Sequence, residues 1–274
     1  MTARFRNTLP FLLLLACMQP DASAQRSNKA PPPDPAADPL LRAAGFLESH
    51  PDIRYRLLGL EKHDKNKYDD ALRFFRRASY YGDKPSQGMV AEMYWTGHGI
   101  PQDRALAYAW MDLAAERGYA GFSGLRERYW NQMDDAERAR ALEVGQAVYA
   151  EYGDAAAQPR LANVLRRARR QMTGSRTGFT GNLQIYIPGP SGEIQIDGSK
   201  FYDERYWDPK QYQAWHDEVW MKPRIGRVSV GEVEQVPGTS PGGSRIPSVE
   251  PAKDTQEPET PPVNESGLGT RKDG

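Results

Sequence analysis

The sequence has little cysteine and no surplus of charge. Cys17 is the only cysteine among 274 residues, so a mature chain that begins after it has no thiol for disulfide bonds or thiol catalysis. Lys and Arg together number 36, as do Asp and Glu, which gives a formal net charge of +0. No net positive field therefore favours nucleic acid or an acidic membrane, and we do not expect nucleic acid as a partner.

Signatures of catalysis and of cofactor binding are also missing. The histidines stand at no metal-ligand spacing; they are His50, His63, His98 and His216. Residues 174–181 form a glycine-rich loop that lacks Gly-Lys-Ser/Thr, so it is a flexible link or an anion-binding nest but no P-loop. No Gly-x-Ser-x-Gly elbow is present. We expect neither an enzyme nor a bound metal or cofactor.

The N-terminal residues have the pattern of an export signal. Two arginines precede an apolar run over 11–18 that is too short to span a bilayer. Small residues then lead up to Ala24, as signal cleavage requires. We therefore expect 1–24 to be a signal peptide that is cut between Ala24 and Gln25.

A second interpretation of this region involves Cys17. The Leu-Leu-Ala that precedes it resembles the box of bacterial lipoproteins, whose cysteine is lipidated and becomes the N-terminus. An uncleaved tail is the plain alternative. In the first two cases the protein is exported: it is periplasmic or secreted, or it is a lipoprotein anchored through Cys17.

The most regular feature of the chain is a set of small and aromatic residues that recurs 36 positions later. The first copy is Ala71, Phe74, Ala78 and Gly82, and the second is Ala107, Trp110, Ala114 and Gly118. A fixed period of this length indicates stacked helical hairpins, each of which buries its apolar face only against its neighbours. We expect repeats over about 52–84 and 85–120.

The second repeat carries a longer signature. Its members are Ala91, Met93, Tyr94, Gly97, Gly99, Asp103, Ala107, Trp110, Ala114, Ala115 and Gly118. This pattern resembles the Sel-1-like repeat family, relatives of the tetratricopeptide solenoids, in an exported bacterial form. The first repeat departs from it, because Phe74 replaces the tryptophan and 61–63 replace the Gly-x-Gly turn. The resemblance implies a right-handed stack of helical hairpins that mediates protein–protein contacts and has no catalytic residues.

The remaining patterns complete the domain organisation. A polar, proline-rich linker over 25–38 leads into a helical repeat domain over 39–172, whose capping helices include one that opens at Gln158. Alternating isoleucines predict a β-hairpin within a small aromatic-rich module over 173–236. The polar composition of 237–274 predicts a disordered tail. The predicted fold is mainly α: a short α-solenoid of helix-turn-helix repeats, then a small C-terminal β-hairpin and aromatic-rich module, with disordered ends.

Arginines crowd the last helix of the repeat domain and are candidate partner-binding residues. They include Arg166, Arg167 and Arg170. A charge run of this kind is commonly a solvated helix face. The alternative is a contact with an acidic protein, an anionic lipid or a polysaccharide of the cell envelope or cell wall.

The aromatic-rich module supplies the other candidate partner-binding residues, Tyr206, Trp207 and Trp215. Such rings stack on sugars or anchor interfaces, or else they pack the core of the module itself. Because the repeats match and no catalytic constellation accompanies them, we expect an exported helical-repeat protein that mediates protein–protein interaction as a scaffold or adaptor. The alternative is binding of cell-wall glycan or another carbohydrate through the module.

Overall fold

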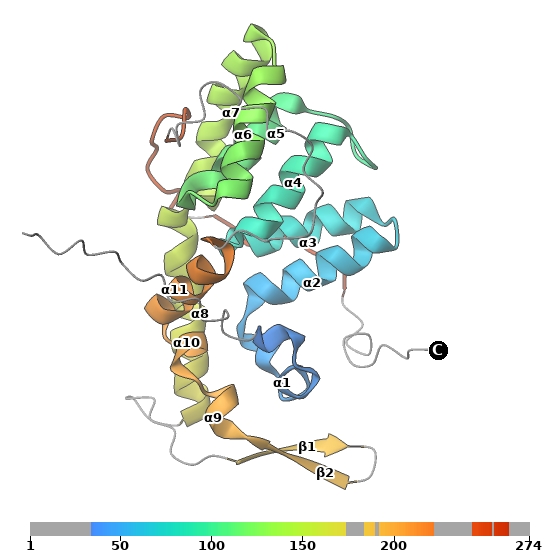
Figure 1. Cartoon of the computed structure of the whole chain (residues 1–274), viewed down its shortest axis with the longest axis vertical. Helices are drawn as coiled ribbons and strands as arrows, with labels where there is room; N and C mark the ends of the chain where they lie inside the picture. The colour runs from blue at the N-terminus through green and yellow to red at the C-terminus, as the bar shows by residue number, and fades with distance from the viewer. Residues whose placement is uncertain (1–33, 174–183, 190–191, 222–242, 254, 263–274) are drawn as a thin grey trace, which may run out of the picture. The chain divides into compact units, whose positions relative to one another are not determined.

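The computed structural model describes residues 34–173, 184–189, 192–221, 243–253 and 255–262. These residues are mainly helical, and one two-stranded antiparallel hairpin follows the long helices (Figure 1). The predicted fold class is therefore confirmed. The alternating residues over 227–233 also predict a third strand, and they lie outside the described residues. Among the helices that are described, none is long and apolar enough to cross a membrane.

Two helical hairpins, two further helices and a long final helix form the repeat domain. Their bounds are α2 (Pro51–Asp64), α3 (Tyr68–Tyr80), α4 (Lys84–Thr96), α5 (Arg104–Ala114), α6 (Ala120–Gln132), α7 (Asp135–Tyr152) and α8 (Asp154–Thr173). Helix α2 packs on α3, α3 on α4, and α4 on α5. Because α5 also packs on α6 and α7, the hairpins form one continuous stack.

Equivalent glycines end the second helix of the first two hairpins. Gly82 follows α3 and Gly118 follows α5, with φ angles of +84° and +71°. These angles lie in the left-handed region, where a side chain is strained, so glycine terminates both helices at low cost. Gly97 and Gly99 form the turn after α4, and the carboxylate of Asp103 then caps the start of α5.

The equivalent aromatic residues of the two repeats, Phe74 and Trp110, are both core residues. Their side chains are 1% and 3% exposed. The ring of Phe74 stacks on Tyr55 of α2, and the ring of Trp110 lies 4.7 Å from that of Tyr152 in α7. The signature alanines around them are wholly buried; they are Ala71, Ala78, Ala91, Ala107 and Ala114. These small residues let the helices approach closely, and the large rings fill the space between them.

Side-chain contacts from the second hairpin to the segments that follow it share one sequence spacing, which is close to the 36-residue period of the repeat. Four hydrogen-bonded pairs each join residues 37 apart in the chain: Glu92–Tyr129, Asp103–Arg140, Asp112–Tyr149 and Arg117–Asp154. Asp134 and Glu137 form a capping box at the start of α7. Helices α6 and α7 therefore continue the stack as a degenerate third unit.

A second core joins the N-terminal turns to the C-terminal module. The module comprises β1 (Gln184–Gly189), β2 (Gly192–Asp197), α9 (Gly198–Phe201), α10 (Glu204–Trp207) and α11 (Pro209–Met221). It packs with α8 on α1 (Pro39–Ala43) and η2 (Phe46–Ser49). The two ring nitrogens of the buried His50 lie 2.7 and 2.8 Å from the carbonyl oxygens of Phe46 and Tyr206. His50 therefore links the N-terminal turns to the C-terminal module.

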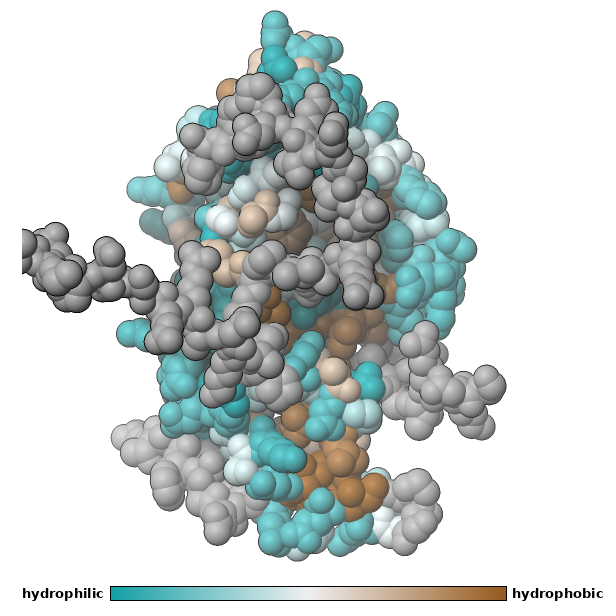
Figure 2. Space-filling view, in the orientation of Figure 1, coloured by the Kyte–Doolittle hydropathy of each residue, from teal (hydrophilic) through white to brown (hydrophobic). Residues whose placement is uncertain are grey.

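Apolar side chains also reach the surface beside this second core. Figure 2 shows hydrophobic residues gathered near α1 and the hairpin, on a face that is otherwise largely hydrophilic. Leu40 of α1 and Tyr186 of β1 are 40% and 56% exposed. Exposed apolar residues of this kind are common on protein surfaces and assign no function by themselves.

Two predicted boundaries are corrected. Pro35 and Ala36 are buried in the short helix η1 (Pro35–Ala37), so the extended linker cannot reach residue 38. Helix α8 begins at Asp154, ahead of the predicted start, and includes Pro159 in its second turn. There a proline removes only one backbone hydrogen bond, and ion pairs of Asp154 hold the turn before it.

Replacing Trp110 by Ala should lower the free energy of unfolding by about 3–5 kcal/mol, because it leaves a large cavity between α5 and α7. Chemical denaturation monitored by circular dichroism measures this loss. Leu60→Ala is the matched control, since Leu60 is 37% exposed and should lose less than about 1 kcal/mol. A similarly small loss for Trp110→Ala would show that the ring is not a core residue.

Candidate docking surface on the helical repeats

The C-terminal part of the chain lies on the helical repeats in an extended form. We call residues 243–253 and 255–262 the strap; they contain no helix or strand and contact α3, α5, α6 and α7 (Figure 1). These residues have no regular secondary structure, as their composition predicts, yet their side chains contact the repeats. Their order comes from side-chain contacts with the repeats, which replace the secondary structure that the composition does not favour.

Ile246 is the apolar anchor of the strap. Its side chain is 5% exposed and belongs to the same core cluster as Trp110. It lies against Gly145 of α7, where a Cβ atom would come within 2.4 Å of the Cδ1 of Ile246. The missing side chain at Gly145 therefore leaves the space that Ile246 occupies, which we call the Gly145 seat. Burial of the isoleucine there contributes about 2 kcal/mol of hydrophobic stabilisation.

Arg245 makes the principal charged contact of the strap. Its two Nη atoms donate to the two carboxylate oxygens of Glu127 in α6, at 2.9 and 2.5 Å. Its guanidinium also lies 4.8 Å from the ring centroid of Trp130. The hydrogen bonds from Arg245 lower the pKa of Glu127. A planar guanidinium satisfies the forked carboxylate and the aromatic face together, which a lysine cannot do.

Asp112 of α5 accepts a hydrogen bond from Ser244, the residue before this arginine. It is fully buried, and its Oδ2 accepts hydrogen bonds from the hydroxyls of Ser244 and Tyr149. Its Oδ1 has no hydrogen-bond partner among the described residues, although Arg126 Nη1 lies 3.7 Å away. A cavity of about 460 Å³ lies between these groups and the strap. The strap therefore fills this part of the surface only partly.

The second half of the strap makes polar contacts. The Ala252 N–H donates to the Ala150 carbonyl at 2.8 Å, which is among the last carbonyls of α7 and has no partner within the helix. Further along, the Tyr80 hydroxyl donates to a strap carbonyl at 2.9 Å, and Arg77 pairs with Glu257 at 2.6 Å. These contacts extend the strap from α7 to α3.

A buried charge cluster joins the hairpins to α8 beside the strap. Lys84 is 1% exposed, and its Nζ lies 2.6 Å from Glu116 and 3.1 Å from Asp154. Arg117 donates to both oxygens of Asp154 at 2.7 and 2.9 Å. Burial by itself would raise the pKa of Asp154, but the charges of Lys84 and Arg117 overcome it and hold the pKa at about 2.

The aromatic residues predicted to bind a partner are core residues. Tyr206, Trp207 and Trp215 are 4%, 2% and 5% exposed and belong to the second core. The Trp207 indole donates to the Phe201 carbonyl. Their faces are covered by protein, so they cannot serve as a stacking platform for sugars, and the prediction of a site there is corrected. They instead pack the module against η2 and α8.

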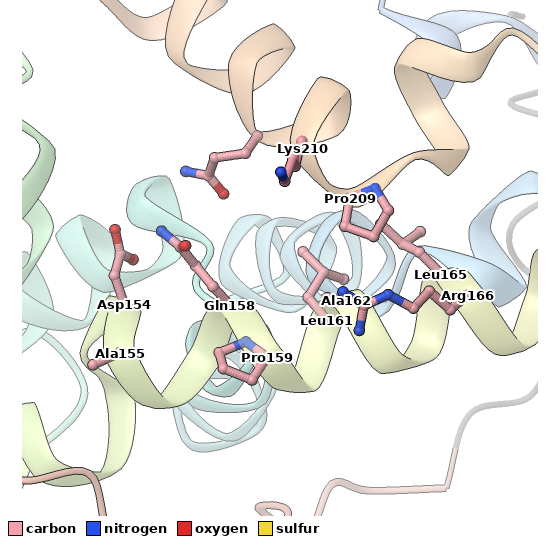
Figure 3. Close-up of a pocket in the computed structure, with 11 residues that line it drawn as sticks. Asp154, Ala155, Gln158, Pro159, Leu161, Ala162, Leu165, Arg166, Pro209 and Lys210 are labelled. Carbon is pink, nitrogen blue, oxygen red and sulfur yellow. The ribbon is translucent and has the colours of Figure 1, made fainter.

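The predicted arginine site is exposed. Arg166, Arg167 and Arg170 all lie on the outer surface of α8. Arg166 lines a cavity of about 520 Å³, which Figure 3 shows bounded by α8 residues on one side and by Pro209 and Lys210 of α11 on the other. None of the three belongs to the strap surface.

The structure brings the scattered histidines into two pairs. The rings of His63 and His98 have centroids 6.4 Å apart, and the Nε2 of His216 lies 3.5 Å from Asp52, beside His50. Across the described ranges, no group of three His, Cys, Asp or Glu side chains could hold a metal ion.

Comparison with known proteins matches one part of the chain. A family model described as Sel1 repeat matches residues 85–119. The matched region covers α4, α5 and the turn at Gly118, which is the hairpin with the full signature. No curated protein and no solved structure matches the chain.

Acid should weaken the charge cluster through Asp154. Its pKa of about 2 in the folded state lies below the usual 3.8, so the stability it contributes is present above about pH 4 and is lost as the pH falls toward 2. The shift corresponds to about 2 kcal/mol. In urea denaturation at pH 5 and at pH 3, Asp154→Asn should lose less stability on acidification than the parent protein does.

Asp135→Asn provides the control for that measurement, because the Asp135 side chain is 99% exposed. It should keep the acid dependence of the parent protein. Equal acid dependence in the parent and in Asp154→Asn would contradict the assignment of this carboxylate to the cluster.

Proposed function

Because this chain is a Sel1-like repeat protein, we propose that it is an exported adaptor whose helical repeats hold an extended segment of another protein in the cell envelope. Sel1 repeats are in general helical modules of protein–protein interaction. The observation that carries the proposal is the strap, since it is an extended segment held on the repeats mainly by side-chain contacts.

The strap surface has the features of a protein-binding site. It offers an apolar seat at Gly145, an acidic group at Glu127 beside the Trp130 ring, and a buried acceptor at Asp112. Interfaces commonly combine an apolar anchor with a few well-placed polar groups and aromatic rings. No catalytic step is needed to explain this arrangement, so we propose binding without chemistry.

Export is the second part of the proposal, and it is supported by the sequence of residues 1–24. Cleavage after Ala24 would place the protein in the periplasm or outside the cell. Lipidation of Cys17 would instead anchor it to the envelope. Both routes bring the repeats into a compartment where their partner is an envelope protein.

Mass spectrometry of the protein purified from its native host should show a mature N-terminus at Gln25. Cys17→Ser should leave this N-terminus unchanged if Ala24 is the cleavage site. A mature protein that begins at a lipidated Cys17 would assign the anchored form. An intact Met1 in the envelope-free fraction would contradict export.

Photo-crosslinking tests the adaptor function. A photoreactive residue in place of Ser123, which lines the cavity beside Asp112, should capture one distinct protein in envelope preparations. The same residue in place of the exposed Leu60 on α2 provides the control and should capture much less of it. Equal capture at the two positions, or none at either, would contradict docking on this face.

A further inference from the structure

We propose that the strap is a resident ligand, and that the partner docks in its place through a segment of the same chemistry. That segment carries a hydroxyl residue, an arginine and a branched aliphatic residue in succession, followed by proline. The inference rests on the proposed adaptor function and specifies what the partner presents. The strap supplies the pattern as Ser244-Arg245-Ile246-Pro247.

Each seat on the repeats selects one kind of side chain. The Gly145 seat admits a branched aliphatic group and would be closed by a Cβ atom at position 145. Glu127 and the Trp130 ring together fit a guanidinium, which can form two parallel hydrogen bonds and stack on the ring. Asp112 accepts a hydrogen bond from a hydroxyl group. Three neighbouring seats therefore specify three successive side chains.

The backbone of the strap is compatible with an exchangeable ligand. It joins no sheet and replaces no helix of the stack, and its backbone bond to α7 is made by Ala252 to a carbonyl at the helix end. Proline residues follow both Ile246 and Glu250. Proline favours an extended chain and lowers the entropy lost on docking. A partner segment of this kind can therefore make the same contacts without refolding the repeats.

The fit of the strap also leaves room for a tighter ligand. Beside Ser244, a cavity of about 460 Å³ lies between the described residues, and none of them donates a hydrogen bond to Asp112 Oδ1. The ion pair with Glu127 involves an Arg245 side chain that is 34% exposed, so water screens part of the attraction. A partner that fills the cavity and donates to Asp112 Oδ1 would displace the strap.

Binding of a synthetic peptide to the full-length protein tests the proposal. The peptide has the sequence of residues 243–253 with a fluorescent label, and its anisotropy is followed as protein is added. The parent protein should bind it weakly, because the strap holds the seats. Ile246→Asp should release the strap and bind the peptide at least about tenfold more tightly.

Matched variants identify the seats. Gln256→Asp adds the same charge at an exposed strap residue that does not line the cavity and should behave like the parent protein. Gly145→Leu, combined with Ile246→Asp, fills the aliphatic seat and should reverse the gain. A peptide with alanine at the arginine position should bind the Ile246→Asp protein at least about tenfold more weakly than the original peptide.

Arg245→Glu is a second way to release the strap, and it tests the proposal if Ile246→Asp does not fold. It repels Glu127 but leaves Ile246 unchanged, and it should also increase peptide binding. The proposal is overturned if folded variants bind the peptide no better than the parent protein. It is also overturned if the parent protein forms a dimer that Ile246→Asp abolishes, since the strap would then serve a second copy.

The test of this inference and the test of the adaptor function can fail independently of each other. A captured envelope protein whose crosslinked segment lacks an arginine followed by an aliphatic residue would leave the adaptor function standing and overturn this inference. Peptide binding by the released variants, without capture of any envelope protein, would support these seats and contradict the adaptor function.

Discussion

The structure depends on the burial of small and aromatic side chains between neighbouring helical hairpins. A single hairpin cannot cover its own apolar face, so each one needs the next. The wholly buried alanines bring α3, α4 and α5 close together, and Phe74 and Trp110 fill the spaces that remain. Helices α6 and α7 then cover α5, although they have lost most of the signature. The strap then lies against Asp112 of α5 and Gly145 of α7.

The buried charges show how the stack accommodates polar residues in its interior. Lys84 stands at the start of α4, where it lies between the Leu113 carbonyl and two carboxylates, and Arg117 shares Asp154 with it. Removing any one of these groups would leave its partners unpaired away from water, which is costly. The cluster therefore fixes the position of α8 on the hairpins more strictly than apolar packing alone.

Local patterns predicted the repeats but not the contacts between distant segments. Gly82 and Gly118 end helices because of their own backbone freedom, so their role is visible in the sequence. The seat of Ile246 is made by Gly145, which lies 101 positions earlier, and no local pattern connects the two. Composition alone predicted disorder in the strap for that reason. Likewise, the rings of Trp207 and Trp215 could have faced solvent or core, and only the packing on η2 and α8 decides between them.

The position of the strap has a consequence for selectivity. A ligand carried on the same chain competes with every external segment and reduces its apparent affinity by the fraction of molecules in which the seats are free. Segments that only match the aliphatic seat or only match Glu127 cannot overcome this competition, since the strap makes several contacts at once. A segment that uses Gly145, Glu127 and Asp112 together can. The strap therefore raises the number of matching contacts that a partner must make, and it covers an apolar seat that would otherwise be exposed to water.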